Sequence, residues 1–321
     1  MVSFDDVKAA HDRIRKAIIE TPVMTSLTAN QRANCSIFFK CENFQRIGAF
    51  KFRGAYNAIS QLTTEEKARG VIAHSSGNHA QAVALAAKML GIKATIVMPK
   101  NASPVKIAAT KGYGATVVFC EPTVLIREET TQELIESHKY ILIHPYDDSR
   151  IIAGAGTAAF ELINEVGSLD FMFAPVGGGG LISGTAIATK GLCPSAKVIA
   201  VEPEQANDAY RSFKSGRLYP SISPNTIADG LRTSLSELTF SIIHQHVDEI
   251  ITVTENEILE AMRFLWERMK LVVEPSGAVP LAGLFKIKKL VSNQRVGVIL
   301  SGGNVDLTQV FDHWHKQIVG S

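Results

Sequence analysis

Cysteine is scarce in this sequence, and the few cysteines present are not arranged in pairs. The 321 residues include 4 cysteines, at positions 35, 41, 120 and 193, and no two of them have C-x-x-C spacing. A disulfide framework in a secreted protein would need paired spacings, so the pattern favours free thiols in a reducing compartment. We therefore expect a cytoplasmic protein.

An excess of charge of either sign is also missing. Lysine and arginine number 33 against 31 acidic residues, a net charge of +2, and the basic residues are scattered along the chain. A nucleic-acid partner would require a basic face or arm, so none is expected.

Targeting and membrane segments are not apparent either. The start, MVSFDDVKAAHDRIRK, mixes both charge signs and lacks the apolar run of a signal peptide. The 19 residues 171–189 carry no charge, but they include Pro175 and four consecutive glycines. A continuous membrane helix cannot run through such residues, so we expect a strand, a loop and a helix there. We expect no membrane partner.

The composition is otherwise that of a globular protein large enough for about two domains. From residue 70 onwards, short β-branched runs alternate with helical patterns, and the expected strands are 71–76, 94–99, 115–120, 140–145, 171–176 and 197–203. Strands that are apolar on both faces and separated by helices predict an α/β fold with parallel sheets. Ligands of such sheets bind beyond the carboxyl ends of the strands, which directs attention to the junctions 74–79, 176–181 and 300–304.

The junction VGGGGL (176–181) follows an apolar strand and precedes a helix. Unhindered backbone N–H groups and the positive end of the helix dipole would face one point there, which favours an anion and above all a phosphate. The segment is not a P-loop, because no Lys-Ser/Thr follows, and it lacks the third glycine of G-x-G-x-x-G. The alternative is a turn in which glycines let a helix pack closely on a sheet.

Two further features favour chemistry on an amino acid. HSSGNH (74–79) places hydroxyl, amide and imidazole groups at a helix start, where they suit a carboxylate and where a hydroxyl could exchange a proton; helix capping is the alternative. Lys51 lies between Phe50 and Phe52, and a desolvated lysine is a nucleophile or base, although an isolated lysine would more often be a surface residue. A reactive lysine, a phosphate cradle and a carboxylate cradle together indicate pyridoxal phosphate holding an amino acid.

A second glycine pattern offers a competing reading. Gly154, Gly156 and Ala159 satisfy G-x-G-x-x-A on spacing, as in nicotinamide-dependent oxidoreductases. No clean strand leads into Gly154, so this interpretation is disfavoured. A non-catalytic amino-acid sensor is the remaining alternative.

A series of motifs runs in order through nearly the whole chain: TPVMTS (21–26), FFKCENFQRIGAFKFRGA, HSSGNHAQ, IHPYDD, VGGGGLISG, VEPEQAND, TIADG, ERMKLVVEPSGA and ILSGGNVDLT. In this series the sequence resembles the fold type II (β-family) pyridoxal-phosphate enzymes, and within them the serine racemases, with threonine and 3-hydroxyaspartate dehydratases as close relatives. The resemblance implies two open, twisted, mostly parallel sheets wrapped by helices. It also implies a homodimer in which a small mobile domain, 71–146, is inserted into a large cofactor-binding domain formed by 1–70 and 147–321.

The resemblance implies a role for each cofactor contact. Lys51 would hold the aldehyde carbon of pyridoxal 5'-phosphate, and Phe50 would pack on the ring. Asn78 would bond the ring 3-hydroxyl, Ser301 would face the ring nitrogen, and Glu274 would lie near the ring. The phosphate would bind Gly177, Gly178, Gly179, Gly180 and Leu181.

The same resemblance implies the reaction. Ser76 would stand across the substrate from Lys51, and racemisation requires an acid or base on each face of the α-carbon. Threonine dehydratases usually have alanine at this position, whereas hydroxyaspartate dehydratases share the double serine. We therefore expect interconversion of L- and D-serine with elimination to pyruvate and ammonia, or alternatively dehydration of L-threonine or threo-3-hydroxyaspartate. The implied substrate contacts are Ser75, Ser76, Asn78, His79, Arg127 and Thr233.

Two regulatory sites are also implied. Glu202, Ala206 and Asp208 match a divalent-cation site, whose hard oxygen ligands suit Mg²⁺, Ca²⁺ or Mn²⁺; a solvated acidic loop is the alternative. A nucleotide site at the dimer interface, where animal racemases bind ATP as an activator, is matched by Ser26, Arg46, Gln81 and Tyr113. ATP is therefore a candidate activator.

Overall fold

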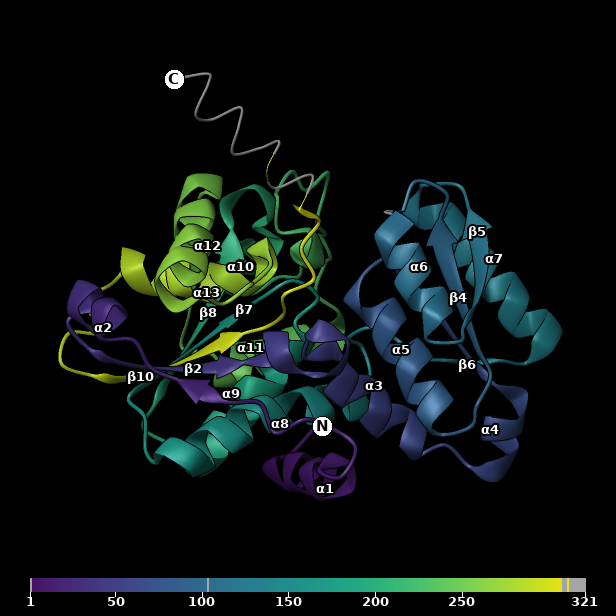
Figure 1. Ribbon diagram of the computed structural model, residues 1–321, viewed down its shortest axis with the longest axis horizontal. Helices are drawn as coiled ribbons and strands as arrows, with labels where there is room; N and C mark the ends of the chain where they lie inside the picture. The colour runs from purple at the N-terminus through teal and green to yellow at the C-terminus, as the bar shows by residue number, and fades with distance from the viewer. Residues whose placement is uncertain (1, 103, 308–310, 312–321) are drawn as a thin grey trace.

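The computed structural model describes residues 2–102, 104–307 and 311, and it contains two sheets that lie side by side (Figure 1). The first sheet has six strands in the order β1 (Val23–Met24), β2 (Ser36–Cys41), β10 (Arg295–Leu300), β7 (Phe171–Pro175), β8 (Lys197–Pro203) and β9 (Glu249–Val253). The second has four strands in the order β5 (Thr116–Cys120), β4 (Ala94–Pro99), β3 (Val71–His74) and β6 (Ile141–Leu142). All pairings are parallel except that of β1 with β2.

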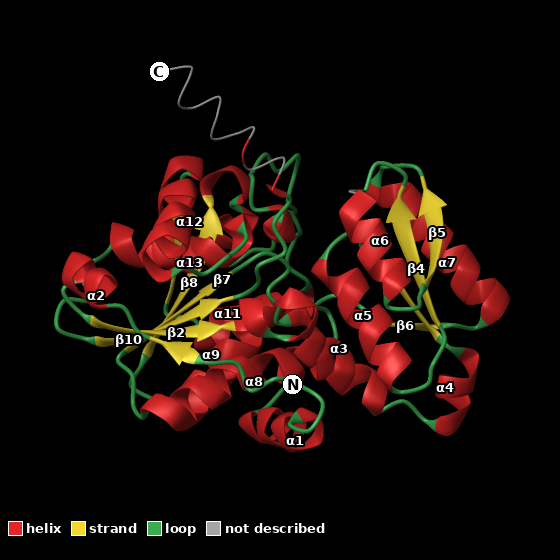
Figure 2. Ribbon diagram, in the orientation of Figure 1, coloured by secondary structure: helices red, strands yellow, loops and turns green. Residues whose placement is uncertain are grey.

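Helices separate most consecutive strands and cover both sheets, as Figure 2 shows. The α-helices are α1 (Phe4–Ile14), α2 (Leu27–Ala33), α3 (Lys51–Ser60), α4 (Thr64–Arg69), α5 (Asn78–Met89), α6 (Pro104–Gly112), α7 (Val124–His138), α8 (Ser149–Val166), α9 (Gly180–Leu192), α10 (Asp208–Ser215), α11 (Glu237–His246), α12 (Glu255–Met269) and α13 (Pro275–Lys286). Short 3₁₀ turns occur at η1 (Glu42–Phe44), η2 (Arg46–Gly48), η3 (Glu204–Ala206) and η4 (Asp229–Leu231). The expected α/β class with mostly parallel sheets is confirmed.

The strands end where side chains begin to bind the backbone. β4 and β8 have the expected bounds, but the strand expected at 140–145 is reduced to two residues. His144 causes this, because its Nδ1 accepts hydrogen bonds from the backbone N–H groups of Tyr146 and Asp147 and turns the chain. Similarly, β3 ends before Ser75, whose Oγ accepts from the N–H of Gly77.

Apolar cores fill both faces of the six-stranded sheet. Along β7, Phe171 and Phe173 point into one core, while Met172 and Ala174 point into the other. This alternation explains why the strand is apolar throughout, as expected of a parallel strand covered on both sides. A third core joins α3 to the four-stranded sheet and to α5, so α3 lies between the two sheets (Figure 1).

The glycines at 154 and 156 lie inside α8, not at a strand-to-helix turn. A Cβ on Gly154 would come within 2.7 Å of the Cα of Gly54 on α3, and one on Gly156 within 2.7 Å of the carbonyl of Gly184 on α9. These glycines therefore allow three helices to pack closely, and the pattern is not a dinucleotide-binding turn.

Residues 171–189 form β7, the glycine loop and most of α9, as expected from their proline and glycines. Among the residues that the structure describes, no helix is both long and apolar enough to cross a membrane.

Candidate active site

Lys51 is the first residue of α3, between the two sheets. Its Nζ donates a 2.8 Å hydrogen bond to the carbonyl of Pro145 and lies 5.2 Å from the centre of the Phe50 ring. Burial lowers the pKa of Lys51 from 10.5 to about 8, because the ammonium form loses its hydration. The amine is thus directed into the protein and is partly neutral near physiological pH, as a nucleophile or base must be.

The glycine loop connects β7 to α9 and has the features of an anion cradle. In the described part of the chain, none of the four backbone N–H groups at 177–180 donates a hydrogen bond to another residue. Gly179 has φ +89°, a left-handed conformation that favours glycine. Free N–H groups at the start of a 13-residue helix fit a phosphate, as the sequence predicts, and Leu181 lies in the first turn of that helix.

Tyr146 connects the lysine to this loop. A Cβ on Gly178 would lie 2.2 Å from Cδ1 of the Tyr146 ring, so the ring packs directly on the loop backbone. Because Pro145 accepts the hydrogen bond from Lys51, two adjacent residues contact the amine and the glycine loop. The structure therefore brings Lys51 and the glycine loop together, as expected of a lysine and a phosphate cradle that serve one cofactor.

Asn78, the first residue of α5, is bonded by two residues that belong to the part of the chain around the six-stranded sheet. Its Nδ2 donates to Oε1 of Glu274 at 2.7 Å, and its Oδ1 accepts from Nδ2 of Asn304 at 2.8 Å. Burial, together with the nearby charge of Asp229, raises the pKa of Glu274 to about 8. Ser301 is buried at the end of β10, and its carbonyl accepts from the N–H of Phe50. These contacts gather the residues expected around a cofactor ring.

The serine loop lies between β3 and α5. Ser75 caps its own turn, and Ser76 is half-buried in the same loop. His79 is 3% exposed, and its Nε2 bonds the carbonyl of Ile143 at 2.8 Å. Burial and the nearby Lys51 hold the pKa of His79 well below its ordinary value, so the ring is neutral. Nε2 must then carry the proton, and Nδ1, which is buried and has no partner among the described residues, is an acceptor.

Arg127 on α7 is half-buried and not a solvated surface residue. Its Nε is buried and has no hydrogen-bond partner in the described ranges. The pKa of His74 is lowered to about 4, mainly by the burial of His74 and next by the positive charge of Arg127. The guanidinium therefore points toward the end of β3. Thr233 lies beside the glycine loop, where its Oγ1 would be 3.3 Å from a Cβ on Gly177.

The acidic residues expected to bind a cation lie together at the end of β8. Both carboxylate oxygens of Glu202 accept backbone N–H bonds at the start of α10, from Ala209 at 3.0 Å and Tyr210 at 2.8 Å. Asp208 is 2% exposed, and neither of its carboxylate oxygens makes a hydrogen bond of ordinary geometry within the described ranges. The hydroxyl of Ser221 and the backbone of Leu235 lie near it and lower its pKa by less than burial raises it. Burial raises the pKa of Asp208 to about 6. Burial also raises the pKa of Glu202 well above its ordinary value, and the negative charge of Asp208 raises it further.

A bound cation would compensate the charge of these two buried carboxylates. Ala206, which lies in η3 between them in the sequence, is also buried. Within the described ranges no three His, Cys, Asp or Glu side chains cluster as a metal site. Two buried carboxylates are hard oxygen donors, so Glu202 and Asp208 fit a hard cation whose other ligands are backbone oxygen and water.

The four expected nucleotide contacts have separate structural roles in this chain. Ser26 caps α2 through the N–H of Ala29, and Nε of Arg46 donates to the carbonyl of Ala17 at 2.6 Å. Gln81 is buried on α5, and Tyr113 packs at the edge of the third core. No hydrogen bond or ion pair of the described residues joins any two of them, and the nucleotide site stays a prediction.

The sequence did not single out three contacts of the site: the carbonyl of Pro145, the ring of Tyr146 and the amide of Asn304. The motifs IHPYDD and LSGGN contain all three, so their positions at chain junctions were the available signal. A backbone carbonyl carries no residue-type signature, which is why Pro145 could not be identified.

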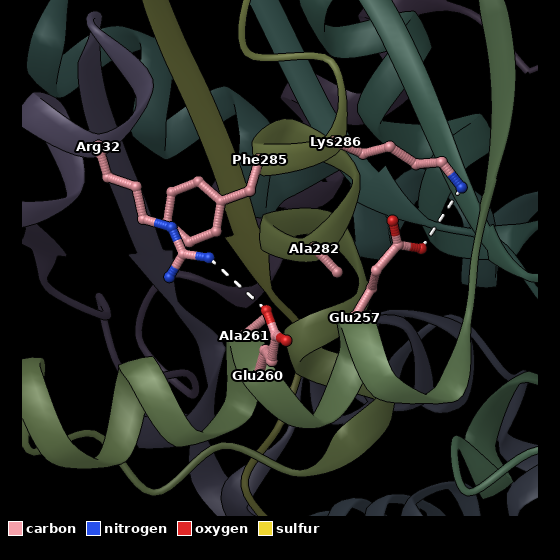
Figure 3. A pocket seen from close by; sticks show the side chains of 7 residues that line it. All are labelled: Arg32, Glu257, Glu260, Ala261, Ala282, Phe285 and Lys286. Carbon is pink, nitrogen blue, oxygen red and sulfur yellow. Dashed lines mark hydrogen bonds and ion pairs between the residues drawn. The ribbon is translucent and has the colours of Figure 1, made fainter.

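A groove of about 160 Å³ lies elsewhere, between α2, α12 and α13 (Figure 3). Its charged groups satisfy one another: Arg32 stacks on Phe285 at 4.1 Å and approaches Glu260 at 3.8 Å, while Lys286 pairs with Glu257 at 3.4 Å. None of the expected site residues lines it.

The parallel sheets, the lysine at a helix start and the glycine cradle define a pyridoxal-phosphate enzyme of fold type II, and comparison with known proteins agrees. Residues 14–302 match the family model of pyridoxal-phosphate dependent enzymes, and the chain belongs to this family.

Two curated relatives are equally similar and differ in reaction. The chain is 50% identical to an L-threo-3-hydroxyaspartate ammonia-lyase of Saccharomyces cerevisiae, covering 95% of this chain and 94% of that enzyme. It is also 50% identical to a serine racemase of Dictyostelium discoideum, covering 96% and 97%. The crystal structure of the Dictyostelium enzyme has a TM-score of 0.91 to this structure and covers 95% of this chain and 99% of that one. The overall sequence identity therefore establishes the family, but it does not distinguish racemisation from ammonia elimination, which has to be argued from the site residues.

Proposed function

We propose that this protein is a serine racemase that interconverts L- and D-serine and also eliminates water from serine to give pyruvate and ammonia. The observation that carries the proposal is a desolvated lysine, Lys51, in a structure whose serine loop has a second hydroxyl at Ser76. Relatives that are named serine racemases from several organisms, with 45–50% identity, support it.

Several residues fit pyridoxal 5'-phosphate. The free N–H groups of the glycine loop would hold the phosphate, Lys51 the aldehyde carbon, and Asn78 and Ser301 the ring, with Phe50 and Glu274 beside it. Bound there, pyridoxal phosphate would supply an electron sink that makes the α-proton of an amino acid acidic. If Ser301 faces the ring nitrogen, its neutral hydroxyl would draw less charge into the ring than the acid of aminotransferases does, and transamination would be disfavoured.

The protein's own groups would move the proton. Nζ of Lys51 takes the α-proton from one face of L-serine, and Oγ of Ser76 returns a proton on the other face. With a pKa of about 8, Lys51 keeps roughly a tenth of its amine neutral at pH 7, whereas an ordinary lysine keeps under a thousandth. The carbonyl of Pro145 accepts a hydrogen bond from the same nitrogen and orients it. Ser75, Asn78, His79 and Thr233 would complete the substrate's surroundings.

Glu202, Ala206 and Asp208 would bind Mg²⁺, Ca²⁺ or Mn²⁺. The burial of both carboxylates supports this, as do the two carboxylate oxygens of Asp208, which make no hydrogen bond of ordinary geometry among the described residues. We propose that residues 71–146, which contain the whole four-stranded sheet, move as a small domain against the rest of a homodimer. Four free, buried cysteines support a cytoplasmic location. ATP as an activator would have to compete for Ser26 and Arg46, which already bind the backbone N–H of Ala29 and the carbonyl of Ala17.

One observation favours a second candidate function, dehydration of L-threo-3-hydroxyaspartate. The half-buried guanidinium of Arg127 has a buried Nε without a partner among the described residues, which suits a second carboxylate on the substrate. The yeast relative of 50% identity bears the name of that activity.

The two functions are separated by measuring D-serine and pyruvate from L-serine, alongside keto-acid formation from L-threo-3-hydroxyaspartate and L-threonine. We expect Ser76→Ala to lower L-to-D conversion by about 10²-fold or more, the contribution of an acid–base group, while pyruvate formation from L-serine stays within a few-fold. Ser75→Ala is the matched control, because loss of a substrate contact should lower both products together. Equal loss of both products in Ser76→Ala, or no D-serine from the wild type, would contradict racemisation.

A further inference from the structure

The largest fully buried side chain among the described residues is a charged one, Arg53, two residues after Lys51. All five of its N–H groups donate hydrogen bonds. Nε and Nη2 bind Glu42 at 2.7 and 2.8 Å, Nη1 and Nη2 bind Glu161 at 2.7 Å each, and Nη1 also binds Oγ1 of Thr157 at 3.1 Å. Such complete use of a guanidinium fixes its position and its plane.

The buried cluster is balanced in charge. Lys40 is also fully buried and binds Glu161 at 2.8 Å and the carbonyl of Thr21 at 2.7 Å, so two cations face two carboxylates. Buried ion clusters of this kind are often no more stabilising than apolar side chains of the same volume. Stability alone therefore does not account for an arginine here, and a geometric role does.

The cluster joins the helix of Lys51 to two other elements. Glu42 lies in η1, directly after β2, and Glu161 lies on α8. Phe50 at the N-cap of α3 offers no side-chain hydrogen bond, and the first turn has no acidic residue. The N–H of Phe50 binds the carbonyl of Ser301 and Phe52 packs in the third core, while Arg53 ties the same turn to η1 and α8. The contacts of Arg53 thus set where the first turn of α3 lies relative to η1 and α8, and hence where Lys51 lies relative to Pro145.

We propose that Arg53 is a positioning residue for Lys51: by binding Glu42 and Glu161 at once, it holds the first turn of α3 so that the lysine amine stays in its buried place at Pro145. The inference rests on the proposed role of Lys51. It predicts that lysine cannot replace Arg53, because a lysine has three donors in place of five and cannot bind two carboxylates in one plane.

The test measures the reactivity of the Lys51 amine directly. Cofactor-stripped protein is mixed with pyridoxal phosphate, the product is trapped with borohydride, and the peptide that contains Lys51 is quantified by mass spectrometry at pH values from about 6 to about 11. In the wild type the trapping rate should rise with a midpoint near pH 8. In Arg53→Lys the amine should regain water, so the midpoint should move toward the ordinary lysine value of 10.5. The rate at pH 7 should then fall by at least about tenfold, with full recovery of the ordinary pKa giving about 300-fold.

Lys40→Met is the matched control, because it removes a cation from the same cluster without changing α3. We expect it to lower thermal stability and to leave the midpoint near that of the wild type. Glu161→Gln is the second variant should Arg53→Lys not fold. The amide keeps one oxygen that can accept from Arg53, and the bonds to Glu42 remain, so the guanidinium is loosened less and the midpoint should move upward by less.

Each outcome decides the proposal. An upward shift in Arg53→Lys or Glu161→Gln, absent in Lys40→Met, supports it. Midpoints unchanged in all variants, or shifted equally in Lys40→Met, overturn it, because the cluster then acts on stability alone. A wild-type protein that is not trapped at Lys51 would instead refute the proposed role of the lysine.

Discussion

Replacing Gly178 by alanine tests whether the glycine loop is shaped by contact with Tyr146 and must keep that shape to bind a phosphate. The added Cβ would lie 2.2 Å, 2.3 Å and 2.5 Å from three ring carbons of Tyr146, where ordinary contacts begin at about 3.4 Å. Either the ring or the loop must move. Overpacking of this kind typically costs about 1–3 kcal/mol. If the loop moves, the same loss in cofactor binding corresponds to an affinity about 5- to 150-fold weaker.

The assay is titration of the stripped protein with pyridoxal phosphate, followed by its visible absorbance, together with urea unfolding. Gly112→Ala is the matched control, because a Cβ there meets nothing within 4 Å and lies in a helix, where alanine should be neutral or stabilising by up to about 1 kcal/mol. Removing the ring as well should relieve the clash. The double variant Gly178→Ala/Tyr146→Ala should therefore lose less than the sum of the single losses, by about 0.5–3 kcal/mol.

Unchanged affinity and unchanged stability in Gly178→Ala would show that the loop has room for a side chain, and the contact with Tyr146 would then be irrelevant to the site. Strictly additive losses in the double variant would equally refute the argument, since they would mean that the ring and the methyl group do not meet.

Two further predictions concern buried carboxylates. Glu274 has its folded pKa raised from 4.5 to about 8, so the folded state holds a proton that the unfolded state releases, and stability should fall as pH rises from about 4.5 to about 8. Glu274→Gln should remove that decline in the free energy of unfolding, and an identical decline in both proteins would contradict the raised pKa. Adding Mg²⁺ or Ca²⁺ at about 100 times its Kd should stabilise the wild type by about 2.7 kcal/mol, and a chelator should reverse this. Asp208→Asn should abolish the effect, while Glu204→Gln, at an exposed acid four residues earlier in the chain, should keep it. A response that survives in Asp208→Asn would exclude this site.

Much of the fold could be predicted because its signals are local. The β-branched runs of β4 and β8 and the glycines that begin α9 are contiguous in the sequence, and each element's apolar pattern reports its own burial. The strand expected at 140–145 was too long because a single side chain, His144, binds the backbone beyond it, and no periodicity reports such a bond.

The site was predicted less completely because its contacts are distant in sequence. Asn78 is bonded by Asn304, 226 residues away, and Lys51 by the carbonyl of Pro145, 94 residues away. Neither partner has a residue-type signal that marks it as part of a site. The glycines at 154 and 156 show that spacing alone is a poor guide. They satisfy a nucleotide-binding pattern, which the missing strand before Gly154 disfavours, and in the structure three helices pack there.

The most direct test of the whole account is to find which residue becomes covalently attached when the purified protein, as isolated, is treated with borohydride and digested. We expect the pyridoxyl group on Lys51 and loss of the visible absorbance. A label on another lysine, or a colourless protein with no label at all, would contradict the assignment of this site.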